Sequence, residues 1–183
     1  MELQRAICKA GTEAVLQGKE VWGIENVNEL REEFLSALMA IHLHSALSLP
    51  ARTEQLYTGL CDKFGIDVTV DVKKKIGGLR ADIVIYESSK ENSKPITLVE
   101  IKKFAEAGKS LSISDDLRKD VAVLLKSRMK IYAGVLVCET TTEQIEKRQA
   151  TLKNALLDGK IVFSAPVTTS QNWQWCFACA ELN

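Results

Sequence analysis

The strongest constraint on the fold is the uninterrupted apolar run Tyr132–Cys138, with the sequence YAGVLVC. The run is far shorter than the roughly 20 apolar residues that a membrane-spanning helix needs. Short apolar runs of this kind are typical of a β-strand that is buried on both faces. Such a strand needs helices on each side of its sheet. We therefore expect an α/β fold with a central sheet between helices.

The rest of the chain contains both kinds of element. Apolar spacing predicts helices over residues 2–17, 27–48, 51–64, 113–129 and 142–157. Alternating apolar residues predict further strands over residues 66–76, 80–87, 95–104, 160–167 and 173–182. Three strands in succession, followed by a helix and another strand, predict a mixed central β-sheet flanked by helices. We expect residues 1–26 to be an N-terminal helical extension and residues 27–183 to form one domain.

Composition and charge exclude several classes of protein. Hydrophobic residues make up 46% of the chain and charged residues 26%, which is enough apolar material for a core and excludes a disordered chain. Lys and Arg number 24, as do Asp and Glu, so the formal net charge is zero. This balance argues against non-specific coating of nucleic acid. The basic excess lies in residues 71–130, where we expect any polyanion to bind.

The five cysteines are odd in number and scattered, which favours a reduced, cytoplasmic protein. Cys176 and Cys179 have the Cys-x-x-Cys spacing of one of the two ligand pairs in a typical zinc site. Both lie on a predicted strand, however, where positions three apart point to opposite faces and cannot easily share a metal. We therefore expect buried thiols here.

Charged residues interrupt two of the predicted apolar strands. Glu100 and Lys102 share one face of the strand 95–104, and Asp82 begins the apolar part of the strand 80–87. Burying such charges costs several kcal/mol unless they are compensated. If the two strands are neighbours, Asp82 and Glu100 converge, and their repulsion raises the pKa of one of them. A divalent cation that prefers oxygen ligands, Mg²⁺ or Mn²⁺, would remove this conflict.

This pattern, Asp82 followed by Glu100-Ile101-Lys102, resembles the PD-(D/E)xK nuclease superfamily, which has the restriction-endonuclease-like fold. The expected order of elements is similar to that family's core over roughly residues 27–140. The proline that usually precedes the aspartate is replaced by Ala81. The resemblance implies a metal-dependent nuclease with Mg or Mn as cofactor, and DNA as the favoured substrate.

The resemblance also implies roles for individual residues. Asp82 and Glu100 would ligate the metal, and the carbonyl of Ile101 would add a ligand. Lys102 would orient or deprotonate the attacking water and stabilise charge on the phosphate.

Two helices would add polar residues to the site in such a family. Glu29, Glu32 and Glu33 compete for the position on the first core helix. We favour Glu33, because Glu32 points further from the expected apolar stripe formed by Leu30, Phe34, Leu38 and Ile41. On the helix after the Glu-x-Lys segment, we favour Asp120, which would bond to Lys102 or to a water molecule, with Asp116 as second choice.

Basic residues around the expected site suit a phosphate backbone. They are Lys73, Lys74, Lys75, Arg80, Lys103, Lys109, Arg118, Lys119, Lys126, Arg128 and Lys130. We expect nucleic acid as the partner, no membrane contact, and a possible homodimer or partner protein.

Other interpretations of the same residues stay open. Asp82, Glu100 and Lys102 could form ordinary ion pairs at a strand end, and Glu33 could satisfy a helix dipole. The whole chain could instead be a catalytically silent nuclease-fold module for nucleic-acid binding or protein assembly, or an immunity-type protein partner.

Overall fold

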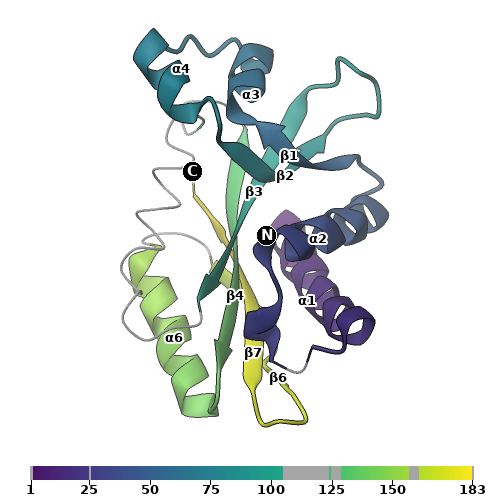
Figure 1. The fold of residues 1–183 in the computed structure, drawn as a ribbon, viewed down its shortest axis with the longest axis vertical. Coiled ribbons are helices and arrows are strands. Elements are labelled where there is room, and N and C mark those ends of the chain that lie inside the picture. The colour runs from purple at the N-terminus through teal and green to yellow at the C-terminus, as the bar shows by residue number, and fades with distance from the viewer. Residues whose placement is uncertain (1, 25, 105–123, 125–128, 157–160, 183) are drawn as a thin grey trace.

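A mixed seven-stranded sheet forms the centre of the computed structural model, which describes residues 2–24, 26–104, 124, 129–156 and 161–182 (Figure 1). The strand order is β1-β2-β3-β4-β7-β5, and β6 also pairs with β7. β3 and β4 are parallel, and the remaining pairs are antiparallel. The strands are β1 (Ala51–Leu56), β2 (Arg80–Tyr86), β3 (Pro95–Phe104), β4 (Lys130–Glu139), β5 (Ile161–Phe163), β6 (Val167–Thr168) and β7 (Gln174–Glu181).

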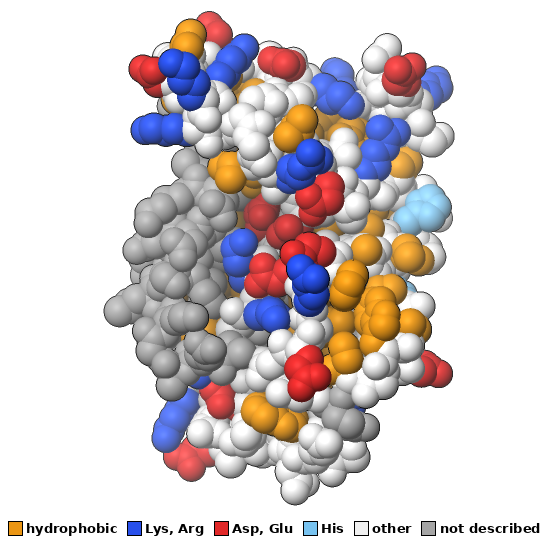
Figure 2. Space-filling view, in the orientation of Figure 1, with side chains coloured by type: hydrophobic (Ala, Val, Ile, Leu, Met, Phe, Trp, Pro, Cys, Tyr) orange, Lys and Arg blue, Asp and Glu red, His pale blue; other side chains and the backbone are white. Residues whose placement is uncertain are grey.

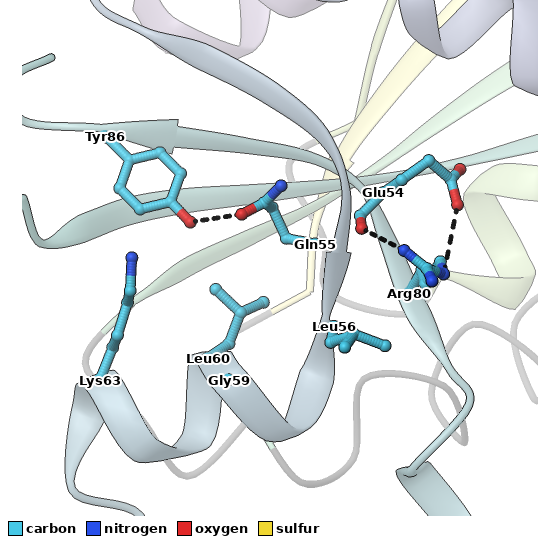
Figure 3. A pocket seen from close by; sticks show the side chains of 8 residues that line it. All are labelled: Glu54, Gln55, Leu56, Gly59, Leu60, Lys63, Arg80 and Tyr86. Carbon is cyan, nitrogen blue, oxygen red and sulfur yellow. Dashed lines mark hydrogen bonds and ion pairs between the residues drawn. The ribbon is translucent and has the colours of Figure 1, made fainter. Parts of the chain in front are cut away.

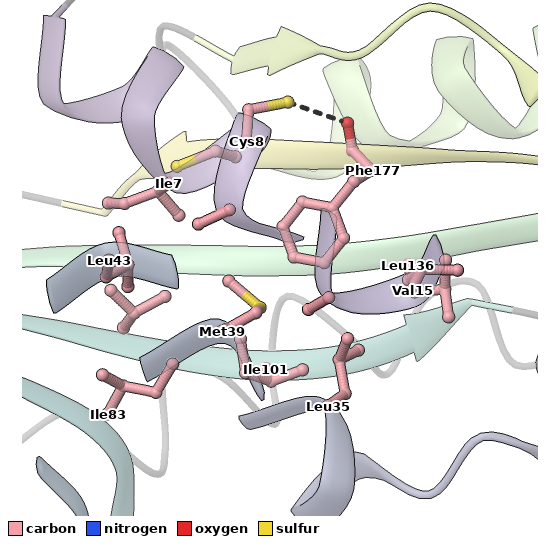
Figure 4. Close-up of a cluster of buried hydrophobic side chains, with 14 of the residues drawn as sticks. Ile7, Cys8, Val15, Leu35, Met39, Leu43, Ile83, Ile101, Leu136 and Phe177 are labelled. Carbon is pink, nitrogen blue, oxygen red and sulfur yellow. Dashed lines mark hydrogen bonds between the residues drawn. The ribbon is translucent and has the colours of Figure 1, made fainter. Parts of the chain in front are cut away.

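Helices cover both faces of this sheet. α1 (Glu2–Trp22) and α2 (Glu32–Leu47) pack on one face, with a short 3₁₀ helix, η1 (Val27–Glu29), between them. Their buried side chains form a single apolar cluster with the odd-numbered residues of β2 and β3 (Figure 4). α3 (Tyr57–Phe64) and α6 (Thr142–Ala155) cover separate parts of the other face, near α4 (Val70–Ile76) and β4 respectively. The α/β fold with a mixed sheet is therefore confirmed.

The apolar run that suggested this fold lies in β4, at the centre of the sheet. Every residue from Ile131 to Cys138 is buried, and β4 pairs with β3 on one side and β7 on the other. The expected N-terminal extension is the helix α1, whose residues Ile7, Ala14 and Val15 belong to the main apolar cluster. In the described part of the chain, no helix combines the length and apolar character needed to cross a membrane.

The predicted helix over residues 51–64 is wrong in its first half. Residues 51–56 form the edge strand β1, and only residues 57–64 are helical. Pairing with β2 along Ala51–Leu56 supplies hydrogen bonds that outweigh the local helical preference.

The predicted strand over residues 66–76 is also wrong, because residues 70–76 form the helix α4. The Thr69 side chain caps this helix by accepting a hydrogen bond from the Val72 N–H at 3.4 Å. Asp71 lies in its first turn and Lys73, Lys74 and Lys75 in its last turn, an arrangement that suits the helix dipole. The antiparallel meander exists, but its first strand is β1.

Three other boundaries differ from expectation. The helix expected over residues 2–17 extends to Trp22. The predicted helix over residues 27–48 is divided into η1 and α2 by extended backbone at Leu30 and Arg31. The predicted strand over residues 160–167 is reduced to the separate strands β5 and β6. The predicted helix over residues 113–129 lies almost wholly outside the described residues.

Candidate active site

Asp82 and Glu100 meet where β2 and β3 stop pairing through their backbones. The last paired residues are Ile83 and Val99, and continuing that register places Asp82 opposite Glu100. One residue further along β3, the Ile101 N–H donates to Asp82 Oδ2 at 2.6 Å. The Asp82 carboxylate therefore accepts a hydrogen bond from β3 that a backbone carbonyl of β2 would accept if the two strands continued to pair.

Glu100 is buried and closely held. It is 3% exposed and lies on the sheet face that also carries the apolar residues Val84 and Leu98. The Tyr57 hydroxyl, at the start of α3, donates to Glu100 Oε1 at 2.5 Å. Burial, and then the neighbouring charge of Asp82, raise the pKa of Glu100 to about 8.

The two neighbouring carboxyl groups influence each other's pKa. Burial also raises the pKa of Asp82, and the Ile101 N–H and the Lys102 charge oppose that rise. A hydrogen bond between the two carboxyl groups stabilises protonated Glu100 and ionised Asp82. The positive charge of Lys102, two residues along the same face of β3, favours ionisation of both groups. The structure thus brings together Asp82, Glu100 and Lys102.

On α2, the carboxylate that lies near Asp82 is that of Glu32 and not that of Glu33. Glu32 Oε1 accepts a hydrogen bond from the Lys103 N–H at 3.1 Å, and its charge adds to the rise in the pKa of Asp82. The Glu33 side chain is 64% exposed and pairs with Arg31 at 3.5 Å, away from the carboxylates.

The choice between the two glutamates depended on which face of α2 is buried. The buried face carries Leu35, Met39 and Leu43, whereas Phe34 and Ile41 are 43% and 58% exposed. Glu32 is in helical register with the buried residues, because positions 32, 39 and 43 recur at about whole turns. The expected apolar stripe was therefore wrong at Phe34 and Ile41, although Leu30 and Leu38 do pack in the main apolar cluster. The choice of Glu33 depended on that stripe.

The expected basic residues do not form one cluster. Lys103 lies beside the carboxylates, but its ammonium donates to the Asn28 carbonyl at 2.9 Å. Arg80 is bound by Glu54, and Lys73, Lys74 and Lys75 lie on α4, at the outer end of the sheet (Figure 1). Lys109, Asp116, Arg118, Lys119, Asp120, Lys126 and Arg128 are outside the described residues, and a ligand role for the Ile101 carbonyl stays a prediction.

Figure 2 shows Asp and Glu side chains gathered near the centre of one face, with Lys and Arg side chains around them. Tyr57 is the residue of this site that the sequence did not reveal. It was expected in the middle of a helix, and only the change from β1 to α3 at Leu56 aims its hydroxyl at Glu100.

The donors present suit a hard cation with most of its ligands supplied by water. Within the described residues, no three His, Cys, Asp or Glu side chains are close enough to enclose a metal ion. Mg²⁺ does not need such an enclosure, because it is commonly held by one or two carboxylates, waters and substrate phosphate. Asp82 and Glu100, two oxygen donors opposite each other on β2 and β3, fit that requirement.

No protein-family model, curated protein or solved structure matches the chain.

Proposed function

We propose that the chain is a Mg²⁺- or Mn²⁺-dependent nuclease of the restriction-endonuclease-like fold, with DNA as the favoured substrate. The observation that carries the proposal is the buried pair Asp82 and Glu100, with Lys102 beside it. Buried carboxylates that repel each other destabilise a fold, and such arrangements are concentrated at functional sites. The antiparallel meander β1-β2-β3 followed by the parallel strand β4 supports the same proposal.

A divalent cation would resolve the electrostatic conflict at this pair. Asp82 and Glu100 would hold the ion, Glu100 would release its proton, and the Tyr57 hydroxyl would keep one Glu100 oxygen in place. The bound ion would polarise a phosphodiester and lower the pKa of a water molecule.

In this proposal Lys102 would act on the reacting groups. Its charge influences both carboxyls, so its ammonium lies near the position that a scissile phosphate would occupy. There it would orient the attacking water and stabilise the charge that develops on the phosphate oxygens. Glu32, which fixes the Lys103 backbone, would hold this end of β3 in position. The buried, free thiols of all five cysteines support a reducing compartment, which we propose is the cytoplasm.

The proposal is tested by cleavage of plasmid, linear and single-stranded DNA and of RNA, with Mg²⁺ or Mn²⁺ and with EDTA. Asp82→Asn and Lys102→Met should each lower the rate by at least about 100-fold, a loss typical for removing a charge-stabilising group. Asp67→Asn, which changes an exposed loop carboxylate, is the matched control and should cleave like the wild type.

A catalytically silent nucleic-acid-binding module is the second candidate. The commitment of the Lys103 ammonium to Asn28 favours this interpretation. It predicts DNA binding that is unchanged by EDTA and by Asp82→Asn, together with no cleavage of any substrate.

A further inference from the structure

The helix α2 is apolar on the side that faces away from the sheet as well as on the side that packs against it. From Phe34 to Leu47 its sequence contains no Asp, Glu, Lys or Arg. Leu35 and Leu43 are buried in the main apolar cluster, whereas Phe34 and Ile41 are exposed. A helix that is apolar all round is normally buried on all sides. The outer side of α2 therefore lacks the cover that its composition predicts.

The exposed side chains of α2 continue onto the end of α1. The Trp22 ring stacks on the Phe34 ring, with 5.0 Å between the two centroids. Figure 2 shows hydrophobic side chains gathered over these two helices, beside the acidic centre of the same face. The apolar patch consists of Val21, Trp22, Phe34, Leu38 and Ile41.

Val21 belongs to the patch because α1 and α2 run antiparallel. Gln17 Oε1 and His42 Nε2 are 2.9 Å apart and fix the register of the two helices. Val21 lies one turn after Gln17, and Leu38 lies one turn before His42. The two apolar side chains therefore lie next to each other.

The area of the apolar patch suits a dimer interface. Val21 and Ile41 are 61% and 58% exposed, and Trp22 and Phe34 are 44% and 43% exposed. At about 200 Å² for each side chain, these four expose roughly 400 Å² of apolar surface. Interfaces are roughly 60% apolar, so this area per chain corresponds to about 1,300 Å² buried in total. Specific protein–protein interfaces bury roughly 1,200–2,000 Å².

Two exposed apolar residues outside the patch lie instead among charged groups. Leu56 lines a cavity of about 300 Å³ whose wall also contains the ion pair of Glu54 and Arg80 at 4.0 Å (Figure 3). Val70 begins α4, which has Asp71 in its first turn and three lysines in its last. Single apolar residues of this kind are ordinary on protein surfaces and need no partner.

The charges beside the patch suit a second copy of the same chain. Arg31 and Glu33 are 69% and 64% exposed and pair at 3.5 Å, and the Arg31 guanidinium lies 5.8 Å from the centre of the Phe34 ring. The edge of the patch thus carries both signs of charge, and the formal net charge of the chain is zero. Two copies can therefore meet without net repulsion, whereas a strongly charged partner would require an edge of one sign.

We propose that the apolar patch binds the same patch of a second copy of this chain and forms a two-fold symmetric dimer. Trp22 and Phe34 supply the aromatic surface that is enriched at such interfaces. Each residue of the patch acts twice in this dimer, once from each chain. Association through the patch requires neither a metal ion nor nucleic acid, so it is independent of the proposed hydrolysis.

The test is sedimentation velocity of the full chain in EDTA, from about 1 to about 100 μM. The wild type should sediment mainly as two chains at the highest concentration and should dissociate on dilution. Ile41→Glu and Phe34→Glu should each weaken association at least about tenfold, because each places two unpaired charges in the interface. Val70→Glu, which changes a similarly exposed apolar residue on α4 at the outer end of the sheet, is the matched control and should associate like the wild type (Figure 1).

Thermal melting separates loss of association from loss of folding. The melting temperature of the wild type should rise with protein concentration, whereas that of Ile41→Glu should not. If Ile41→Glu does not fold, Ile41→Ser, which adds no charge, takes its place. A wild type that stays a single chain at about 100 μM would leave the patch to a different partner and overturns the proposal. A dimer that forms equally well in the folded variant of Ile41 also overturns it.

Discussion

Replacing Glu100 with Gln should make the protein more stable at pH 8 and should flatten its dependence on pH. Gln has nearly the same shape, its oxygen can still accept from Tyr57, and its amide can donate to Asp82 as protonated Glu100 does. The variant therefore removes the ionisation of this residue with little change in packing.

The magnitude follows from the pKa of Glu100, which burial and Asp82 raise from 4.5 to about 8. Because the folded state binds this proton more tightly than the unfolded state, the free energy of unfolding falls as pH rises between these values. The stabilisation is fully present below pH 4.5 and is lost by about pH 8. At 1.36 kcal/mol per pKa unit, the loss is about 5 kcal/mol.

The assay is urea denaturation in EDTA at intervals from pH 5 to pH 8.5, for the wild type and Glu100→Gln. We expect the difference between the two curves to grow by at least about 2 kcal/mol across this range, as the raised pKa requires. Saturating Mg²⁺ should restore about 2.7 kcal/mol to the wild type at pH 8 when it is present at 100 times its dissociation constant. If the free energy of unfolding changed with pH in the same way in both proteins, the raised pKa of Glu100 would be refuted.

Three further predictions test other parts of the structure. Tyr57→Phe removes the hydroxyl that donates to buried Glu100 and should cost about 1–3 kcal/mol in urea denaturation at pH 8.5; an unchanged midpoint would contradict the 2.5 Å hydrogen bond. Glu32→Gln should weaken Mn²⁺-dependent cleavage, whereas Glu33→Gln should not, and equal effects would show that the wrong face of α2 had been assigned to the site. Gly134→Ala should lower stability by about 1–3 kcal/mol, because the new Cβ would lie 2.9 Å from Phe177; a thermal melt like that of the wild type would contradict the packing of β4.

The strands at the centre of the sheet were predictable because most of their residues are apolar. Residues 95–104 and 132–138 carry enough apolar side chains to be buried whatever the surrounding chain does. The meeting of Asp82 and Glu100 followed from the same patterns, since two neighbouring antiparallel strands fix which side chains face each other.

The parts that were wrong depend on contacts distant in the sequence. Residues 51–56 carry no strong strand pattern and become β1 through pairing with β2. The alternating apolar residues from Ile66 to Val72 suit a strand, but the Thr69 cap and the charges of α4 determine the outcome. The choice between Glu32 and Glu33 depended on which side of α2 meets the sheet, which α1 and β3 decide.

The most direct test of the metal site is a calorimetric titration of the wild type and Asp82→Asn with Mn²⁺ at pH 7. The titration is repeated in two buffers with different ionisation enthalpies, so that proton release is counted along with binding. Because Glu100 holds a proton at this pH, we predict one Mn²⁺ per chain with release of about one proton, and at least tenfold weaker binding by Asp82→Asn. Absence of binding by the wild type, or equal binding by the variant, would contradict a metal site at Asp82 and Glu100.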